Sequence, residues 1–460
     1  MPIISRDPTQ LANPALHPDF QANINVFIEP PKWAGILTPD YIPPNSALLP
    51  DGVTPRFASA SRRVSKKRRV MDTSDPTNES KKVPFWGFHE KGGGETGEEE
   101  NDYHFPSQPI RIVEGQIFHG KLHNTSIGGQ HTIHWHGLEP TGHNDGVGKL
   151  SMEVGSKGYE YQWVASAAGT YFYHCHRNTP LHFEMGMYGM LLIDPQNPRR
   201  VAGAPRLNPS RLRDEPLAPY AFGGPGYVRR GNDIVRYDVE AIWVSDDVDP
   251  VWHEFSHNHG FADTGPAGIP DANGNDLGVK FEDVAMHHPE RSLHLFRPQY
   301  FVISGVPHPW TRLDVLPVAL DPELAFLSPI PARVQFDQTL LVRLLCASYG
   351  VCRYTFEGLD VEVIAMDGRV LGQTPHTRYS APFKIAAGVP FELTAARRFD
   401  LLIRPTSSEV GAHRVLVEFK DRITKVNWGI AETFIHVVGR GQGGGQGQGV
   451  GGGRANNPNR

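Results

Sequence analysis

The sequence has few cysteines, no long apolar run and no excess of positive charge. The three cysteines, Cys175, Cys346 and Cys352, cannot form a disulfide framework, and at most one bridge, between Cys346 and Cys352, is available. No apolar stretch approaches the ~18–20 residues of a membrane-spanning helix, so we expect no membrane span. Lys and Arg total 45 against 50 for Asp and Glu, which argues against nucleic-acid binding. The first residues also lack the apolar core of a secretory signal.

Turn-forming residues are abundant. The chain has 48 glycines and 40 prolines among 460 residues, a share of about a fifth against roughly 12% in average proteins. Many short runs of Val, Ile, Phe and Tyr separate these turn residues, and this pattern predicts an all-β fold. Because the length exceeds what one compact core usually spans, we expect two or three domains.

Changes in composition along the chain predict the domain organisation. We expect an N-terminal extension (1–82, largely irregular), a first strand-rich domain (83–196), a linker (197–232), a second strand-rich domain (233–438) with a His-rich insertion (250–295), and a flexible Gly-rich tail (439–460). The basic run 62–69 in the extension is interpreted as a flexible, solvated arm, with a nucleic-acid patch or targeting signal as the alternative.

Two histidine-containing segments carry the candidate chemistry, HTIHWHG at 131–137 and YHCHRNTPLHFEMGMYG at 173–189. If both lie on strands, alternate side chains point to opposite faces. His134 and His136 then share one face, and His131 points to the other. In the second segment, His174 and His176 share a face while Cys175 points away. The pattern therefore predicts two metal sites back to back, one with four imidazoles and one with a thiolate.

The thiolate side is completed by residues that follow Cys175. His182 and Met187 lie 7 and 12 residues further along the chain, and two imidazoles, a thiolate and a weak thioether are the ligands of a blue copper site. Met185 is the alternative thioether ligand, and Met190 is expected in the core. A structural zinc site would usually pair sulfurs, as in CxxC, which the sequence lacks. The four-imidazole site suits copper or zinc, and the neighbouring blue copper-type site favours copper.

The segments HWHG (134–137), NDGVG (144–148), GTYFYHCH (169–176) and GMYGMLLIDP (186–195) resemble the multicopper oxidase family of cupredoxin proteins. The resemblance is strong over about 105–196 and weak over 235–438. It implies an all-β fold of two cupredoxin-type Greek-key β-sandwich domains. It also implies the copper ligands: His131, Cys175, His182 and Met187 for type 1 copper, His134 for type 2, and His136, His174 and His176 for the type 3 pair.

The second strand-rich region departs from the family pattern. A complete cluster in the family takes histidines from two domains, but the matching places here read CRYTFEG (352–358) and VEFK (417–420). Substitute ligands are expected from the insertion, with His257 and His259 as the first candidates. The remaining histidines of the insertion are further candidates, and all of these histidines are alternatively polar surface residues.

The resemblance implies a laccase-like copper oxidoreductase. A small-molecule or metal-ion donor would lose an electron at the type 1 site through an exposed His182, and Cys175 and its flanking peptides would carry the electron to a type 2/type 3-like site that reduces oxygen. Asp145 is the candidate catalytic residue, as a proton relay or an anchor for the imidazoles; its alternative role is to form the Asn-Asp-Gly turn.

Two other functions stay open, a copper nitrite reductase-like enzyme with a mononuclear type 2 site and a non-catalytic electron carrier. Copper content separates the three, at roughly four, two and one ion per chain. Because one domain supplies only half of a polynuclear site, we expect a homotrimer with sites between neighbours. The family resemblance suggests a periplasmic or extracellular location.

Overall fold

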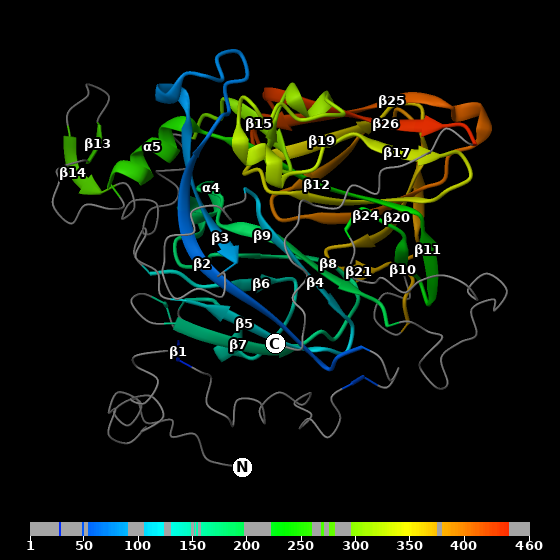
Figure 1. Ribbon diagram of the computed structural model, residues 1–460, viewed down its shortest axis with the longest axis horizontal. Helices are drawn as coiled ribbons and strands as arrows, with labels where there is room; N and C mark the ends of the chain where they lie inside the picture. The colour runs from blue at the N-terminus through cyan, green and yellow to red at the C-terminus, as the bar shows by residue number, and fades with distance from the viewer. Residues whose placement is uncertain are drawn as a thin grey trace, which may run out of the picture.

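The computed structural model describes residues 27–28, 48–49, 54–90, 105–123, 130–148, 151, 153–154, 158–196, 222–259, 268–270, 276–280, 296–374 and 380–440. Strands dominate these residues, and the two α-helices are short (Figure 1). They are α4 (Thr179–Glu184) and α5 (Pro250–His259). None of the described helices is long and apolar enough to cross a membrane.

The first β-sandwich consists of a five-stranded and a four-stranded sheet. The five-stranded sheet has the order β1 (Phe27–Ile28), β7 (Gly158–Val164), β5 (Ile117–Leu122), β2 (Phe57–Arg69) and β3 (Val83–Glu90). The four-stranded sheet has the order β4 (Ser107–Val113), β9 (Tyr188–Asp194), β8 (Gly169–His174) and β6 (His134–His136). Large aromatic side chains from both sheets, Trp86, Phe118, Trp135 and Tyr161 among them, form one buried core between them.

The second β-sandwich has the same two-layer design. One sheet has the order β16 (Val306–Pro307), β15 (Tyr300–Ile303), β12 (Val239–Val248), β18 (Leu340–Cys346), β24 (Arg398–Ile403), β20 (Val361–Met366) and β21 (Arg369–Val370), with β22 (Phe383–Ile385) also on β20. The other has the order β17 (Ala332–Gln335), β26 (Asn427–Val438), β25 (Gly411–Lys420), β19 (Val351–Phe356) and β23 (Phe391–Thr394). Their facing residues form the largest apolar core of the described residues.

Smaller elements connect and flank the sandwiches. Two-stranded sheets are formed by β10 (Gly226–Arg230) with β11 (Asp233–Tyr237) and by β13 (Gly268–Pro270) with β14 (Asp276–Lys280). Short 3-10 helices lie at Glu79–Lys81, Gly142–Asn144, Trp310–Arg312, Pro322–Phe326 and Ser407–Glu409. The predicted linker therefore ends in a strand, β10, and the predicted His-rich insertion begins with a helix, α5. The tail lies outside the described residues from residue 441 on.

The two sandwiches stack into four layers of sheet (Figure 1). A third apolar core, which includes Phe172 and Met190 from the first sandwich and Val244 and Leu345 from the second, fills the space between the middle layers. This contact explains why every residue of β8 and β9 is buried, because strands covered on both faces have no solvent side. The predictions of an all-β fold and of two β-sandwiches are confirmed, while the exact domain boundaries stay predictions.

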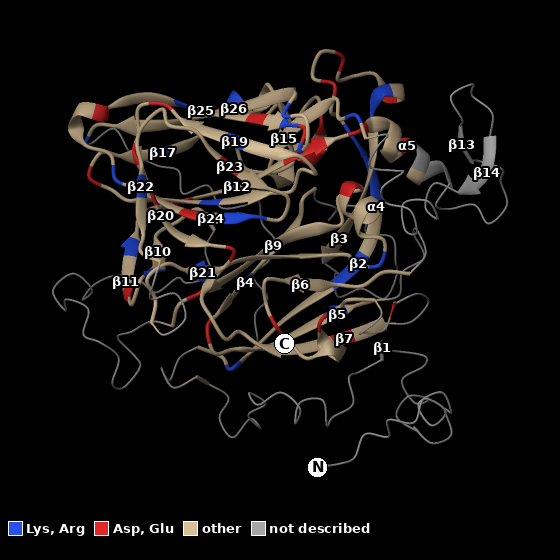
Figure 2. Ribbon diagram, turned by 180° about the vertical axis from the view of Figure 1, so that it is seen from behind, with Lys and Arg blue, Asp and Glu red and all other residues tan. Residues whose placement is uncertain are grey.

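The basic run 62–69 is not a flexible arm, which corrects the sequence interpretation. It is part of β2, which pairs with β3 and β5. Three of its cations pair with acids that follow residue 232: Lys67 with Glu323, Arg68 with Glu254 and the buried Arg69 with Asp321. Figure 2 shows Lys and Arg of β2 in blue near α5, the helix that carries Glu254. No local sequence pattern predicts these ion pairs, because the partners lie about 190–250 residues away in sequence.

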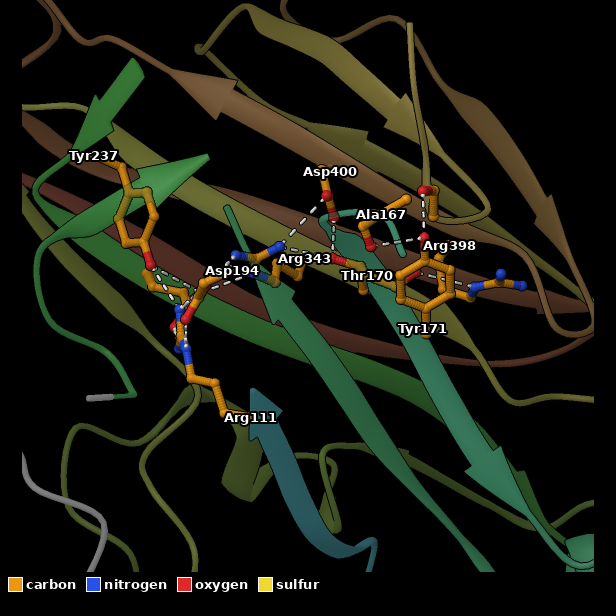
Figure 3. Close-up of polar contacts among 11 residues, drawn as sticks. Arg111, Ala167, Thr170, Tyr171, Asp194, Tyr237, Arg343, Arg398 and Asp400 are labelled. Carbon is orange, nitrogen blue, oxygen red and sulfur yellow. Dashed lines mark hydrogen bonds and ion pairs between the residues drawn. The ribbon is translucent and has the colours of Figure 1, made fainter. Parts of the chain in front are cut away.

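A buried network of charges joins the two sandwiches (Figure 3). Arg111 of β4 donates to both carboxylate oxygens of Asp194 at 2.6 and 2.9 Å and to Glu240 at 2.6 Å. Arg343 donates to Glu240 at 2.7 Å and lies 3.4 Å from Asp400. Burial alone would raise the pKa of Glu240, but Arg111 and Arg343 outweigh burial and lower it. The pair Arg111–Glu240, and the 3.8 Å approach of Arg343 to Asp194, connect the buried charges of one sandwich to those of the other.

Candidate metal centre

Three potential metal-donor atoms lie close together next to the C-terminal end of β8. Cys175 directly follows β8, and its Sγ lies 3.2 Å from Nδ1 of His182 and 3.6 Å from Nδ1 of His131. His182 comes from α4, and His131 is held by an isolated bridge to Val154. All three side chains are buried, and their donor atoms lie within 4.8 Å of one another. We call these residues, with Met187, the sulfur site.

The sulfur site is covered, which corrects the expectation that His182 is exposed. His182 has an exposed fraction of 0%. The Trp86 ring of β3 lies edge-on to His182 with 5.7 Å between ring centroids, and the His131 ring lies 4.6 Å away. Trp86 also donates its backbone N–H to the Met185 carbonyl at 2.7 Å. Sequence reasoning missed Trp86 because it lies about 96 residues before His182 and belongs to no metal-binding pattern.

The loop after α4 brings the thioethers to this site. The Cys175 N–H donates to the Met187 carbonyl at 3.0 Å, and the Met187 N–H donates to the His182 carbonyl at 3.1 Å. Met185 and Met187 both lie in the core of the first sandwich and have no exposed surface. Met190 packs instead into the core between the sandwiches, as expected. The Met187 backbone is therefore hydrogen-bonded to Cys175, whereas the Met185 backbone is hydrogen-bonded to Trp86.

Burial favours the neutral forms of Cys175 and His182 in the sulfur site. Burial raises the pKa of Cys175 to about 11, against the lowering effect of nearby backbone N–H groups. Burial also lowers the pKa of His182 well below its usual value. Neutral imidazoles and a thiol that loses its proton on binding are what a cation with soft and nitrogen ligands requires. The donor set therefore fits a copper ion.

Four imidazoles gather on the other face of the same strands. His134 lies opposite His174 in the antiparallel pair β6–β8, with His136 and His176 two residues further along. The ring centroids of neighbouring imidazoles are 5.0–5.6 Å apart. We call these four residues the imidazole cluster. The expected alternation is present, because Cys175 points away from the cluster between two of its members.

Hydrogen bonds fix the orientation of two rings in the cluster. His134 Nδ1 donates to the Asp145 carbonyl at 2.7 Å, and the Asp145 carboxylate lies 3.3 Å from the same nitrogen. His174 Nδ1 donates to the Cys175 carbonyl at 2.8 Å. A proton on Nδ1 leaves the lone pair on Nε2, which is the atom free to bind a metal. Asp145 thus holds His134 in a metal-binding tautomer.

The turn that presents Asp145 is itself sterically constrained. Gly146 has φ +72°, and a Cβ there would lie 1.8 Å from the Ile133 carbonyl oxygen. Asn144 supports the turn by accepting the Gln162 N–H at 2.8 Å. The Asn-Asp-Gly segment is therefore a turn former, and the same turn sets Asp145 against His134. Both roles that the sequence left open for Asp145 are compatible with its position.

The second sandwich contributes a cation beside the cluster. The Phe172 ring stacks on His136 with centroids 4.3 Å apart, and the Arg398 guanidinium lies 5.4 Å from the Phe172 ring centroid. Burial, then Arg398, then the neighbouring histidines lower the pKa of His136 to about 3. Burial likewise lowers the pKa of His174 well below its usual value. Sequence reasoning missed Arg398 because no local pattern links it to the histidine segments.

The expected second-domain ligands are not placed at the cluster by the described residues. His257 and His259 lie on α5, but their side chains are outside the described part of the structure. At the places where the family has ligands, Cys352, Tyr354 and Phe356 are buried in the apolar core of the second sandwich. Over these strands, the second sandwich has packing residues where the first has imidazoles.

Comparison with known proteins points to one family for the histidine-bearing region. Residues 100–198 match the multicopper oxidase family. Over 103 residues the chain is 35% identical to L-ascorbate oxidase of Cucumis sativus, and over 100 residues it is 34% identical to copper resistance protein A of Escherichia coli. Each match covers 21% of this chain and 16% of the relative. The chain thus spans about a sixth of the length of these curated relatives.

Solved structures to which the chain is similar include a blue copper oxidase from Nitrosomonas europaea, with TM-score 0.49, 18% identity and coverage of 83% of this chain and 86% of that one. A copper nitrite reductase from Nitrosomonas europaea has TM-score 0.45, 12% identity and coverage of 83% and 94%. The family match, over residues 100–198, includes the strands and loops that carry both groups of donor atoms. Residues 100–198 of this chain are therefore similar to the multicopper oxidase family.

Proposed function

We propose that the protein is a copper-dependent oxidoreductase that takes electrons from a reducing substrate and passes them to oxygen. The observation that carries the proposal is the position of Cys175 between His174 and His176. One short segment supplies the thiolate of the sulfur site and two imidazoles of the cluster on the opposite face. Such a segment couples a site that accepts electrons to a second site through covalent bonds.

The ligand assignment follows the two groups of donors. His131, Cys175, His182 and Met187 would hold type 1 copper, His134 type 2 copper, and His136, His174 and His176 a type 3-like site. Bound copper would supply one-electron redox chemistry at the sulfur site and oxygen reduction at the cluster. As the residue that would supply the thioether ligand, Met187 is supported over Met185 by its backbone contact with Cys175.

The protein's own residues organise these sites in three ways. Burial and Trp86 exclude water from the sulfur site. The hydrogen bond from His174 Nδ1 to the Cys175 carbonyl adds a second connection between the two groups of donors, beside the peptide bond itself. Asp145 orients His134, and its half-buried carboxylate is the nearby acid that could hand protons to the cluster.

The electron donor would be a small molecule or a metal ion. Because His182 and the neighbouring Trp86 are both fully buried, donor electrons would reach His182 through the surrounding protein rather than by direct contact with the imidazole. This arrangement favours an outer-sphere donor over one that must coordinate the copper.

The test is copper analysis of the purified protein combined with an oxygen-uptake assay. We expect about four copper ions per chain and oxygen consumption with a phenol or a reduced metal ion as donor. One copper per chain without oxygen uptake would identify an electron carrier and contradict the proposal. Removal of copper with a chelator should abolish the uptake, and adding copper back should restore it.

A copper nitrite reductase-like activity is the second candidate. It is favoured by the donors of His134, His136 and His174, which lie within 4.8 Å of one another and suit a single copper. His176 argues against it, because its ring lies 5.0 Å from His134 and adds a fourth imidazole that a mononuclear site does not need. About two copper ions per chain and nitrite-dependent oxidation of the donor would support this candidate.

We also propose that the cluster is completed by another subunit in a homotrimer. The cluster is partly exposed, with 15% of the His134 side chain accessible, and the described part of the second sandwich adds Arg398 rather than a ligand there. Light scattering should report a trimer with full copper loading. A fully loaded monomer would contradict this assembly while leaving the oxidoreductase proposal intact.

A further inference from the structure

Two cysteines outside the proposed copper sites lie side by side in the second sandwich. Cys346 is the last residue of β18 in the eight-stranded sheet, and Cys352 lies in β19 of the five-stranded sheet. Their Sγ atoms are 3.3 Å apart, and neither side chain has exposed surface. The pair therefore spans the interior between the two sheets of one sandwich.

The backbone holds both residues in place from opposite sides. The Cys346 N–H donates to the Arg397 carbonyl at 3.0 Å, and the Cys346 carbonyl accepts the Ala396 N–H at 2.8 Å. Cys352 pairs in register with Phe419 and Leu393 on its two neighbouring strands. Because a disulfide needs sulfur atoms about 2.05 Å apart, bond formation requires the sulfurs to approach by little more than 1 Å, a movement that side-chain rotation can supply.

We infer that Cys346 and Cys352 are a modification site at which a disulfide forms, linking the two sheets of the second sandwich and closing the loop of residues 347–351. Two S–H bonds break and one S–S bond forms. The two electrons and two protons pass to a disulfide oxidant, which is reduced to two thiols. The inference is independent of copper and goes beyond the proposed function.

The loop of residues 347–351 contacts α4, the helix that carries His182. The Tyr349 hydroxyl donates to the backbone carbonyl of Pro180 in α4. Ser348 donates to the buried Asp247 carboxylate at 2.8 Å, and its hydroxyl accepts the Gly350 N–H at 2.9 Å. The bond would therefore stiffen the part of the second sandwich that supports α4 of the first.

Burial determines when the disulfide can form. Because burial raises the pKa of Cys352 well above its usual value, the folded protein holds little thiolate for exchange. Exchange then takes place while the loop is open, during folding or local unfolding, and the closed core protects the finished bond from reduction. The oxidation state should consequently be set when the chain folds.

The test counts thiols in the 460-residue chain. Protein unfolded in urea with a chelator is refolded in mixtures of oxidised and reduced glutathione, then acid-quenched, unfolded and alkylated before peptide mapping. In oxidised glutathione we expect alkylation at Cys175 alone and a linked peptide pair containing Cys346 and Cys352. Three alkylated cysteines at every glutathione ratio, or a glutathione adduct at Cys346 or Cys352 in place of the linked pair, would overturn the inference.

A second measurement compares melting temperatures. The oxidised wild-type protein should melt about 5 °C above its reduced form, since a short cross-linked loop restricts the unfolded chain. The double variant Cys346→Ala/Cys352→Ala should melt at the same temperature with either form of glutathione, and Cys175→Ala should keep the wild-type difference. Glutathione dependence in the double variant, or its absence in the wild-type protein, would contradict the inference.

Discussion

The two β-sandwiches share an architecture but differ in the side chains that corresponding strands carry. In the first sandwich, the strand ends carry imidazoles and a thiol on alternate faces. In the second, the strands at the corresponding places carry Tyr354, Phe356, Val417 and Phe419, which pack into an apolar core. The same pleated backbone thus supports metal ligands in one region and packing in the other. Fold and chemistry are specified by different residues.

The second sandwich nevertheless supports the site that it does not build. Arg398 lies against Phe172, which stacks on His136, and Tyr349 contacts the backbone of α4. The charges of Arg343, Glu240 and Asp194 fix the two regions to each other. We therefore expect changes in the first sandwich to alter copper chemistry and changes in the second to alter stability.

The largest effect should come from Cys175→Ser. This substitution removes the thiolate from the sulfur site, so the intense visible band of thiolate-bound copper should disappear while the fold remains. An absorption spectrum of the copper-loaded protein measures the change. The matched control is Cys346→Ser, a buried thiol of the second sandwich, which should keep the band. Loss of the band in the control instead would show that the roles of the two regions are reversed.

Removal of an imidazole should separate the two groups of donors within the first sandwich. His134→Ala should lower oxygen uptake by at least about 100-fold, because a ligand of the cluster and its hydrogen bond to Asp145 are lost. The visible band should remain. His413→Ala, in β25 of the second sandwich, serves as the control and should leave uptake within about twofold of wild type. Equal losses in the two variants would contradict the division of roles.

The buried charge network is tested by Arg343→Leu. The substitution leaves the carboxylates of Glu240 and Asp400 buried with less compensating charge, so the free energy of unfolding should fall by about 3–5 kcal/mol. Urea denaturation of the metal-free protein measures it. Arg353→Leu breaks a half-exposed pair with Glu418 in the second sandwich and should cost less than about 1 kcal/mol. A small effect at Arg343 would show that the buried carboxylates of Glu240 and Asp400 do not need its charge.

A smaller effect is expected from pH at the junction between the regions. Burial lowers the pKa of His253 to about 4 from 6.5, so below pH 6.5 the unfolded chain takes up a proton that the folded protein does not. The stability that neutral His253 contributes to the folded protein is therefore complete above pH 6.5, and it is lost as the pH falls to about 4. For metal-free protein, we expect the drop in unfolding free energy between pH 7 and 4 to be about 3 kcal/mol smaller in His253→Gln.

The control for this pH effect is His436→Gln. His436 is less buried, and burial lowers its pKa without a large shift, so the variant should change the slope much less. Urea midpoints at pH 7 and pH 4 give both values. Identical slopes for wild type and His253→Gln would show that His253 is protonated in the folded protein at low pH.

Much of the candidate site could be predicted from the sequence because it depends on local geometry. His134 and His136, or His174 and His176, must share a face of any extended strand, and Cys175 must then point away. The sequence likewise determined the all-β class, since its turn residues and short apolar runs are compatible with little else. These features need no knowledge of distant parts of the chain.

Tertiary structure alone decided what surrounds the donors. Trp86 covers His182, Arg398 lies beside the imidazole cluster, and the cations of β2 meet acids more than a hundred residues away. Each of these contacts joins segments that have no sequence pattern in common, so only the packing of whole sheets brings them together. Local periodicity determines which way a side chain points, but long-range packing determines what it meets there.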